Sequence, residues 1–216
     1  MALIRSAYQD ELDGVSQSLV DLTSMVTASM VKASKAVQTA DLALAEEVIA
    51  SDIKIDDYQH ELDARIIDII ARQQPVASDL RALVTAMRMS ADLERMGDLA
   101  HHIAKVARLR HPERAIPESL ILPFTEMGHV AEKLSIMVAA VITTRDTEMA
   151  LQVEKDDDEM DDLHKKVIAT IIKDDSGLSL ESAIDLTLLG RYYERYADHA
   201  VSVSRRVYFL VTGKFA

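Results

Sequence analysis

Cysteine and tryptophan are absent from this 216-residue chain, which has only three Phe, six Tyr, six Gly and four Pro. The lack of cysteine excludes disulfide staples and thiolate metal sites, and it fits a reducing compartment. The scarcity of turn-forming residues argues against an all-β fold with its frequent hairpins and favours a mostly helical chain. Because apolar residues make up 49% of the chain and aromatic residues only 4%, we expect an aliphatic core.

The 24 Lys and Arg residues are outnumbered by 36 Asp and Glu residues, and long apolar stretches are lacking. The formal net charge is −12, which counts against nucleic acid as a partner, since a nucleic-acid binder needs a positive surface to displace counterions. The longest stretch without Asp, Glu, Lys, Arg or His runs from Leu134 to Thr144, far short of the roughly 20 residues that span a bilayer. The N-terminus turns polar before the apolar core of a signal peptide could form. We therefore expect a soluble, cytoplasmic protein.

Apolar residues recur at three- and four-residue steps along almost the whole chain, which indicates amphipathic helices. Pro75, the Pro-containing stretch His111–Pro123 and the segment Asp174–Gly177 interrupt the pattern, and Gly213 is a typical helix-ending residue. After Pro75, Ser78 or Asp79 would restart the helix. The predicted helices run from about Leu3 to Thr39, from the N-cap Asp41 to Gln74, from Leu80 to Leu109, from Phe124 to Arg145, from Asp146 to Lys173 and from Ser179 to Val211.

Two segments that lie 100 residues apart are similar. Ala91–Ala100 aligns without gaps on Arg191–Ala200, and both contain Glu-Arg-x-x-Asp-x-Ala. The preceding helices also match, because each contains Asp-x-x-apolar-Asp. An internal duplication explains these similarities. The sequence thus predicts an all-α protein with two three-helix units, residues 1–110 and 111–216.

The repeated motifs carry carboxylates four residues apart, so both side chains of a pair leave the same face of a helix. The four pairs are Asp52 with Asp56, Glu94 with Asp98, Asp157 with Asp161, and Glu194 with Asp198. Like charges at this spacing repel by a few tenths of a kcal/mol unless a cation lies between them. If the second and third helices of each unit pack antiparallel, each unit gathers four carboxylates, which suit Fe, Zn, Mn or Mg ions.

Two other interpretations of the acidic pairs stay open. The pairs can be solvated helix faces of a purely structural bundle, although their recurrence at matched positions argues for ligands. They can also belong to a carboxylate-bridged metalloenzyme with redox or hydrolytic activity, because Asp98-x-x-His101 and Asp161-x-x-His164 loosely resemble the Glu-x-x-His step of di-iron bundles. His101 is two turns after Glu94 and could be an extra ligand, whereas neither it nor His199 is matched in the other repeat.

Two further groups of residues have structural interpretations. Arg95 and Arg195 follow the Glu of each motif, and we expect them to form salt bridges between helices. Tyr192, Tyr193 and Tyr196 are expected to pack in the core beneath the last helix.

The chain resembles the PhoU family over nearly its whole length. Gln73–Arg81 is similar to the family's Gln-Pro-x-Ala-x-Asp-Leu-Arg connection, and Asp92–Ala100 and Glu194–His199 are similar to its two acidic motifs. The second repeat departs from the family pattern, because it has Ala197 in place of Gly97 and a shorter connection at Ser176–Ser179.

The resemblance implies a fold and a function. Members of this family consist of two three-helix bundles related by a pseudo-twofold axis, bind metal through Glu/Asp-x-x-x-Asp motifs, and are not known as enzymes. They act as negative regulators that connect a phosphate ABC transporter to a membrane sensor kinase. We therefore expect partners in the transporter's ATPase subunit and a sensor histidine kinase, with membrane association only through these proteins. We also expect a homodimer, although no feature of the sequence shows where two copies would meet. The motif matches are Asp52, Asp56, Glu94, Asp98, Asp157, Asp161, Glu194 and Asp198.

Overall fold

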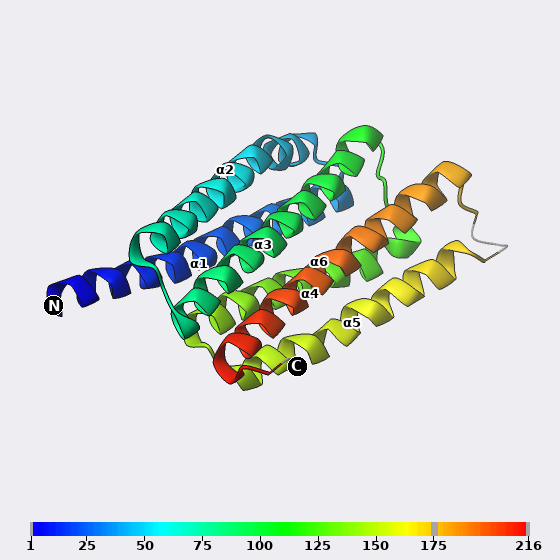
Figure 1. Cartoon of the computed structure of the whole chain (residues 1–216). Coiled ribbons are helices and arrows are strands. Elements are labelled where there is room, and N and C mark those ends of the chain that lie inside the picture. The colour runs from blue at the N-terminus through cyan, green and yellow to red at the C-terminus, as the bar shows by residue number, and fades with distance from the viewer. Residues whose placement is uncertain (1, 174–176, 215–216) are drawn as a thin grey trace.

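The computed structural model describes residues 2–173 and 177–214, which form six α-helices and no strand (Figure 1). The helices are α1 (Ala2–Thr39), α2 (Leu42–Gln73), α3 (Ala77–Arg110), α4 (Glu118–Thr144), α5 (Thr147–Ile171) and α6 (Leu180–Thr212). The predicted all-α class is confirmed. Residues 174–176 of the expected break between the last two helices lie outside the described part. Within the described part, no helix is both long and apolar enough to cross a membrane.

The helices pack in two groups of three that share one body. Helices α1, α2 and α3 contact one another, as do α4, α5 and α6, and the pairs α1–α4 and α3–α6 join the two groups. Figure 1 shows α2 and α5 on opposite flanks, with the other four helices between them. The division of the chain into repeats at residues 110 and 111 stays a prediction.

Several helix ends follow the local signals in the sequence. The Asp41 side chain caps α2 by accepting a hydrogen bond from the backbone N–H of Leu44 at 3.0 Å. Ser179 caps α6 in the same way, and Gly213 ends that helix with a φ of 72°. Glycine adopts this left-handed conformation without the steric cost that other residues have.

Two helix starts differ from the prediction. Helix α3 begins at Ala77, so Ser78 and Asp79 lie in its first turn rather than before it. Helix α4 begins at Glu118, with Pro117 as N-cap, and Pro123 lies inside it. Proline removes one backbone donor from a helix, and the burial of apolar side chains on both sides of Pro123 outweighs that loss here.

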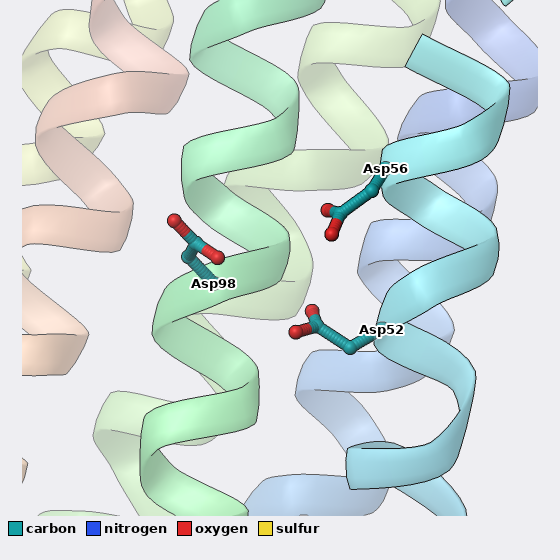
Figure 2. A group of neighbouring side chains, drawn as sticks. All are labelled: Asp52, Asp56 and Asp98. Carbon is teal, nitrogen blue, oxygen red and sulfur yellow. The ribbon is translucent and has the colours of Figure 1, made fainter. Parts of the chain in front are cut away.

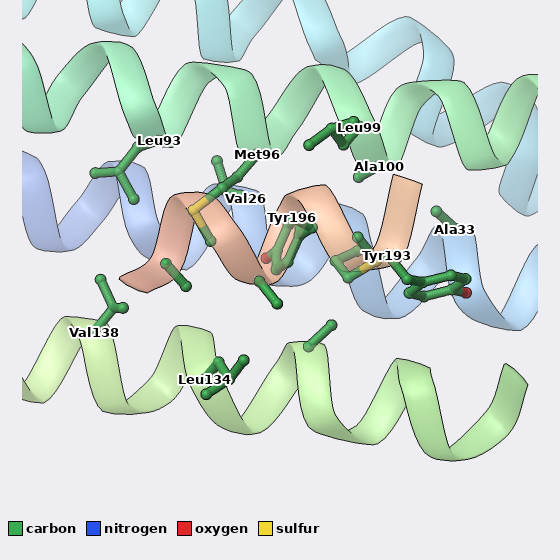
Figure 3. Packing of buried hydrophobic residues seen from close by; sticks show 14 of the residues in the cluster. Val26, Ala33, Leu93, Met96, Leu99, Ala100, Leu134, Val138, Tyr193 and Tyr196 are labelled. Carbon is green, nitrogen blue, oxygen red and sulfur yellow. The ribbon is translucent and has the colours of Figure 1, made fainter. Parts of the chain in front are cut away.

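The core is aliphatic, as expected, with two tyrosines at its centre. In Figure 3, Tyr193 and Tyr196 of α6 lie among side chains that come from α1, α3 and α4. Both tyrosines are fully buried. Tyr193 donates a hydrogen bond to Ser34 Oγ at 2.9 Å, and the Tyr196 hydroxyl lies 2.7 Å from Ser135 Oγ. The paired hydroxyls make the burial of these side chains favourable.

Candidate metal centre

Three carboxylates of the first repeat converge between α2 and α3. Asp52 and Asp56 lie one turn apart on α2 and point towards Asp98 on α3 (Figure 2). One oxygen from each side chain lies within 4.8 Å of the other two. The two helices lie close together here. A Cβ added at Gly97 would be only 3.1 Å from Cγ2 of Ile55.

The three carboxylates repel one another. Burial, followed by the charges of Asp52 and Asp98, raises the pKa of Asp56 above its ordinary value. Oδ1 of Asp56 is buried and has no hydrogen-bond partner in the described part of the chain. Burial and the charge of Asp98 raise the pKa of Glu94 as well. A cation between these oxygens would remove both the repulsion and the missing partner.

Glu94 lies beside this group rather than in it. Arg95 Nη1 donates to Asp98 Oδ2 at 2.7 Å, and Arg95 Nε lies 3.7 Å from Oε2 of Glu94. These ion pairs all lie within α3, and the Arg95 side chain is 63% exposed. The expected salt bridge between helices is therefore wrong for Arg95, because its side chain extends into solvent along its own helix.

His101 lies next to the acidic group. Its Nδ1 contacts Oδ2 of Asp52 across the α2–α3 interface, and both side chains are mostly buried. Nε2 of His101 is buried without a hydrogen-bond partner among the described residues. An imidazole in this place can orient the Asp52 carboxylate or provide a nitrogen ligand.

The corresponding residues of the second repeat are electrostatically coupled but more widely spaced. Burial, followed by the charges of Asp161, Asp198 and Glu194, raises the pKa of Asp157 to about 7. Glu194 pairs with Arg191, and its Oε2 is buried without a hydrogen-bond partner in the described residues. Across residues 2–173 and 177–214, the first-repeat trio is the only group of three potential ligands within the 4.8 Å limit.

A third polar group was not recognised from the sequence. Asp92 of α3 accepts hydrogen bonds from Nδ1 of His199 at 3.1 Å and from Nε of Arg206 at 2.6 Å, both on α6. His199 therefore faces α3 and not the second acidic set. The repeat alignment contained a signal, because Tyr192 and Leu99 replace Asp92 and His199 at the matched positions. Two polar residues that each lack a polar counterpart in the other repeat can be hydrogen-bonded to each other, as Asp92 and His199 are.

The donor set fits a metal ion. Carboxylate oxygens from two helices, one of them buried and unpartnered, are the ligands that hard and borderline cations prefer. Asp52, Asp56 and Asp98 would hold the ion. His101 contacts Asp52, and Glu94 is electrostatically coupled to the trio. The second repeat offers the same four carboxylates in a looser arrangement.

The chain is similar to proteins of one family in both sequence and structure. The family described as the PhoU domain matches residues 19–107 and 124–207. The phosphate-specific transport system accessory protein PhoU homolog 2 of Mycobacterium tuberculosis is 42% identical, with 98% of this chain and all of that protein aligned. PhoU homolog 1 of Mycobacterium leprae is also 42% identical, over 98% of this chain and 96% of that protein. The crystal structure of the phosphate transport system regulatory protein PhoU from Streptococcus pneumoniae superimposes with a TM-score of 0.88 at 25% identity, covering 97% of this chain and 99% of that one. PhoU from Pseudomonas aeruginosa gives 0.85 at 26% identity, covering 96% and 100%.

Proposed function

This chain belongs to the PhoU family, and on that basis we propose that it is an accessory, regulatory protein of phosphate transport that binds metal and acts through partner proteins. The relatives' names and the two matches to the PhoU domain support the transport role. The proposed action is negative regulation of phosphate uptake and of the phosphate-starvation response. No catalytic step is required for it.

The metal-binding part of the proposal is supported by one observation, the buried and unpartnered oxygen of Asp56 within the acidic trio. The bound ion, Fe, Zn, Mn or Mg, would supply positive charge between α2 and α3. Asp52 and Asp56 would then hold α2 against Asp98 of α3, and the outer surface of the first repeat would be rigid. The second repeat would bind an ion in the same manner after a small inward movement of α5.

The proposed partners are the ATPase subunit of a phosphate ABC transporter and a sensor histidine kinase. A cytoplasmic location follows from these partners, and they would bring the chain to the inner face of the membrane. Docking of a rigid two-repeat surface on both proteins would couple transport to signalling. The two repeats, residues 1–110 and 111–216, would offer related surfaces to the two partners.

Elemental analysis of the purified protein tests metal binding. The test variant carries Asp52→Asn, Asp56→Asn and Asp98→Asn, and Asp57→Asn is the matched control, because Asp57 is exposed in the same turn. We expect stoichiometric metal in the parent and control and a loss of at least one ion per chain in the folded triple variant. Equal metal content in all three proteins, or none in the parent after reconstitution, would refute the proposed ligands.

The partner role is tested separately. Purified ATPase subunit and the kinase's cytoplasmic part are each titrated with the metal-loaded chain, with the chelator-treated chain and with the triple variant. We expect tighter binding of the metal-loaded chain. If neither protein binds any form of the chain, the partner assignment is wrong even when metal binding is confirmed.

A carboxylate-bridged metalloenzyme is the second candidate, and the contact of His101 with Asp52 is the observation that favours it. This alternative requires turnover that depends on His101. Oxygen consumption and phosphoester hydrolysis by the metal-loaded parent and by His101→Ala would decide it, since absence of turnover in the parent removes the candidate.

A further inference from the structure

An apolar stripe is exposed at the start of α6. Leu180, Ile184 and Leu188 recur every four residues and are 80%, 51% and 41% exposed. Tyr192, one turn further, is half-buried and continues the same row. We call these four residues the α6 stripe. Large apolar side chains that are exposed in a contiguous row, rather than singly, mark an interaction surface.

Leu109 of α3 extends the stripe sideways. The rings of His102 and Tyr192 stack with their centroids 5.2 Å apart, and Arg110 pairs with Asp185, so α3 and α6 run antiparallel in a fixed register. Leu109 is one heptad beyond His102 and therefore lies on the same face of α3. This register puts Leu109, which is 69% exposed, beside the middle of the α6 stripe.

The first repeat has a shorter apolar row at the equivalent place, and Val76, one turn before that row, is 75% exposed. The residues 100 positions earlier in the aligned repeat are Leu80, Val84, Arg88 and Asp92. Leu80 and Val84 are less exposed, at 39% and 37%, and the other two are charged. The apolar row therefore ends after Val84 in the first repeat, whereas on α6 it continues through Leu188 to Tyr192.

The α6 stripe is complementary to a second copy of itself. When two α6 helices cross antiparallel about a twofold axis at the level of residue 186, Ile184 faces Leu188 of the partner subunit. Leu180 then lies towards Tyr192 of the partner subunit. A twofold interface of this kind uses the same patch on both copies, and rows of residues four apart interdigitate in the commonest class of helix packing.

The charges next to the stripe fit the same arrangement. Glu181 and Arg191 are equally far from residue 186 on its two sides, and their side chains are 71% and 48% exposed. An antiparallel crossing brings Glu181 of one copy towards Arg191 of the partner subunit, and the symmetry repeats this pair. Opposite charges meet in this register, whereas a parallel crossing would bring like charges together.

We propose that two copies of this chain associate through the α6 stripe and Leu109, with Glu181 and Arg191 as reciprocal ion pairs. The proposal deepens the proposed function by naming the interface of the expected homodimer, and it depends on neither metal nor phosphate. A few apolar side chains per copy make a small interface, so a weak and concentration-dependent dimer is expected.

Sedimentation-velocity ultracentrifugation over a wide range of protein concentrations tests the proposal. We expect a monomer–dimer equilibrium in the parent and at least a tenfold weaker dimer for Leu188→Glu and for Ile184→Glu. Ile136→Glu is the matched control, because Ile136 is 58% exposed on α4, away from the stripe. Circular dichroism confirms that each variant is folded. A monomeric parent at all concentrations, or equal effects of all three substitutions, would overturn the proposal.

A charge exchange tests the register. Glu181→Arg and Arg191→Glu should each weaken the dimer about fivefold, since exposed ion pairs contribute modestly and this one occurs twice. The double variant should regain most of the parent's affinity. Within one chain, Glu181 pairs with Arg110 and Arg191 pairs with Glu194, so effects inside the chain would add rather than cancel. A double variant weaker than both single variants would contradict the register. Metal content, measured on the same samples, separates failure of this interface from failure of the metal centre.

Discussion

At the scale of single residues, the charge of Asp56 should lower the stability of the metal-free protein and raise the stability of the metal-loaded protein. Burial, and then the charges of Asp52 and Asp98, raise the pKa of Asp56 in the metal-free form. We predict that Asp56→Asn increases the free energy of unfolding in chelator by a few tenths of a kcal/mol, because it removes like-charge repulsion. With metal present, the same substitution should lower stability, because a ligand is lost.

Urea unfolding with chelator and with added metal measures both effects. Asp57→Asn is the control and should change neither value appreciably, because its side chain is exposed. A loss of stability for Asp56→Asn in chelator would show that the carboxylate is stabilised by something other than a cation.

Asp157 gives the metal-free protein a pH dependence near neutrality. Burial, and then the neighbouring carboxylates, raise its pKa from 3.8 to about 7. Between these values the folded chain holds a proton that the unfolded chain has released, so the free energy of unfolding falls as pH rises through this window. We predict that Asp157→Asn reduces this loss of unfolding free energy with rising pH.

Denaturant midpoints from pH 5 to pH 8 in chelator provide the measurement, with the exposed neighbour variant Asp158→Asn as control. The parent and Asp158→Asn should lose stability towards pH 8 in parallel. If Asp157→Asn follows the same slope, the proton is held elsewhere.

At the scale of helices, the sequence predicts where most helices lie because the signals are local. Asp41, Ser179 and Gly213 act through hydrogen bonds and dihedral angles of their own neighbourhoods, and all three lie where expected. The expected interruption of the helix up to Pro123 is wrong, because the effect of a proline on a helix depends on packing. A proline costs one hydrogen bond, and only the burial of distant partners decides whether the helix continues through it.

The sequence likewise predicts the local part of the candidate site, but not the part that depends on how the helices pack. Spacing of four residues places two carboxylates on one face of a helix, and the structure brings three of them together in the first repeat. Spacing does not determine how closely two helices approach. Gly97 allows Ile55 of α2 to come close, whereas the second repeat has the extra methyl of Ala197 at the matched position. His199 was unassignable for a similar reason, since its partner Asp92 is 107 residues away.

This difference between the repeats leads to a prediction about helix approach. Gly97→Ala introduces a Cβ at 3.1 Å from Cγ2 of Ile55, which should push α2 from α3 by a few tenths of an ångström and weaken metal binding. Stability should change by less than about 1 kcal/mol, because the gain in helix propensity offsets the crowding.

Metal titration of Gly97→Ala and of the converse variant Ala197→Gly tests this idea. The first should lower the affinity of the first repeat, and the second should not. Unchanged metal affinity in Gly97→Ala would show that the carboxylates adjust independently of the helix spacing.

At the scale of the whole molecule, the two groups of helices are joined by polar contacts as well as by the core. Burial alone would raise the pKa of Asp92, but the hydrogen bonds from His199 and Arg206 outweigh it and hold the pKa below its ordinary value. The stability from this network is therefore fully present above the ordinary aspartate pKa of 3.8 and is lost as pH falls through the lower folded-state pKa. At the far end of the same helix pair, Arg110 joins α3 to Asp185 of α6. The α3–α6 interface thus contains ion pairs at two levels.

Neighbouring arginines allow the contribution of this network to be measured. The Asp92 carboxylate is only 13% exposed where Arg206 meets it, whereas Arg205 pairs with Glu154 in a contact that is 51% and 40% exposed. We predict that Arg206→Met lowers the free energy of unfolding by about 1.5–3 kcal/mol, because a buried charge loses a partner. Arg205→Met should cost about 0.2–1 kcal/mol.

Adding Asp92→Asn to Arg206→Met distinguishes coupling from simple packing. If the arginine acts through Asp92, the double variant should be less destabilised than the sum of the single variants, since no unpaired buried charge remains. Additive effects in urea unfolding would instead assign the loss to the packing of the arginine's methylenes. In that case the Asp92 network would add little to the apolar core and the Arg110 ion pairs that also join the repeats. Asp92 should then contribute no extra fall of the unfolding free energy at acid pH.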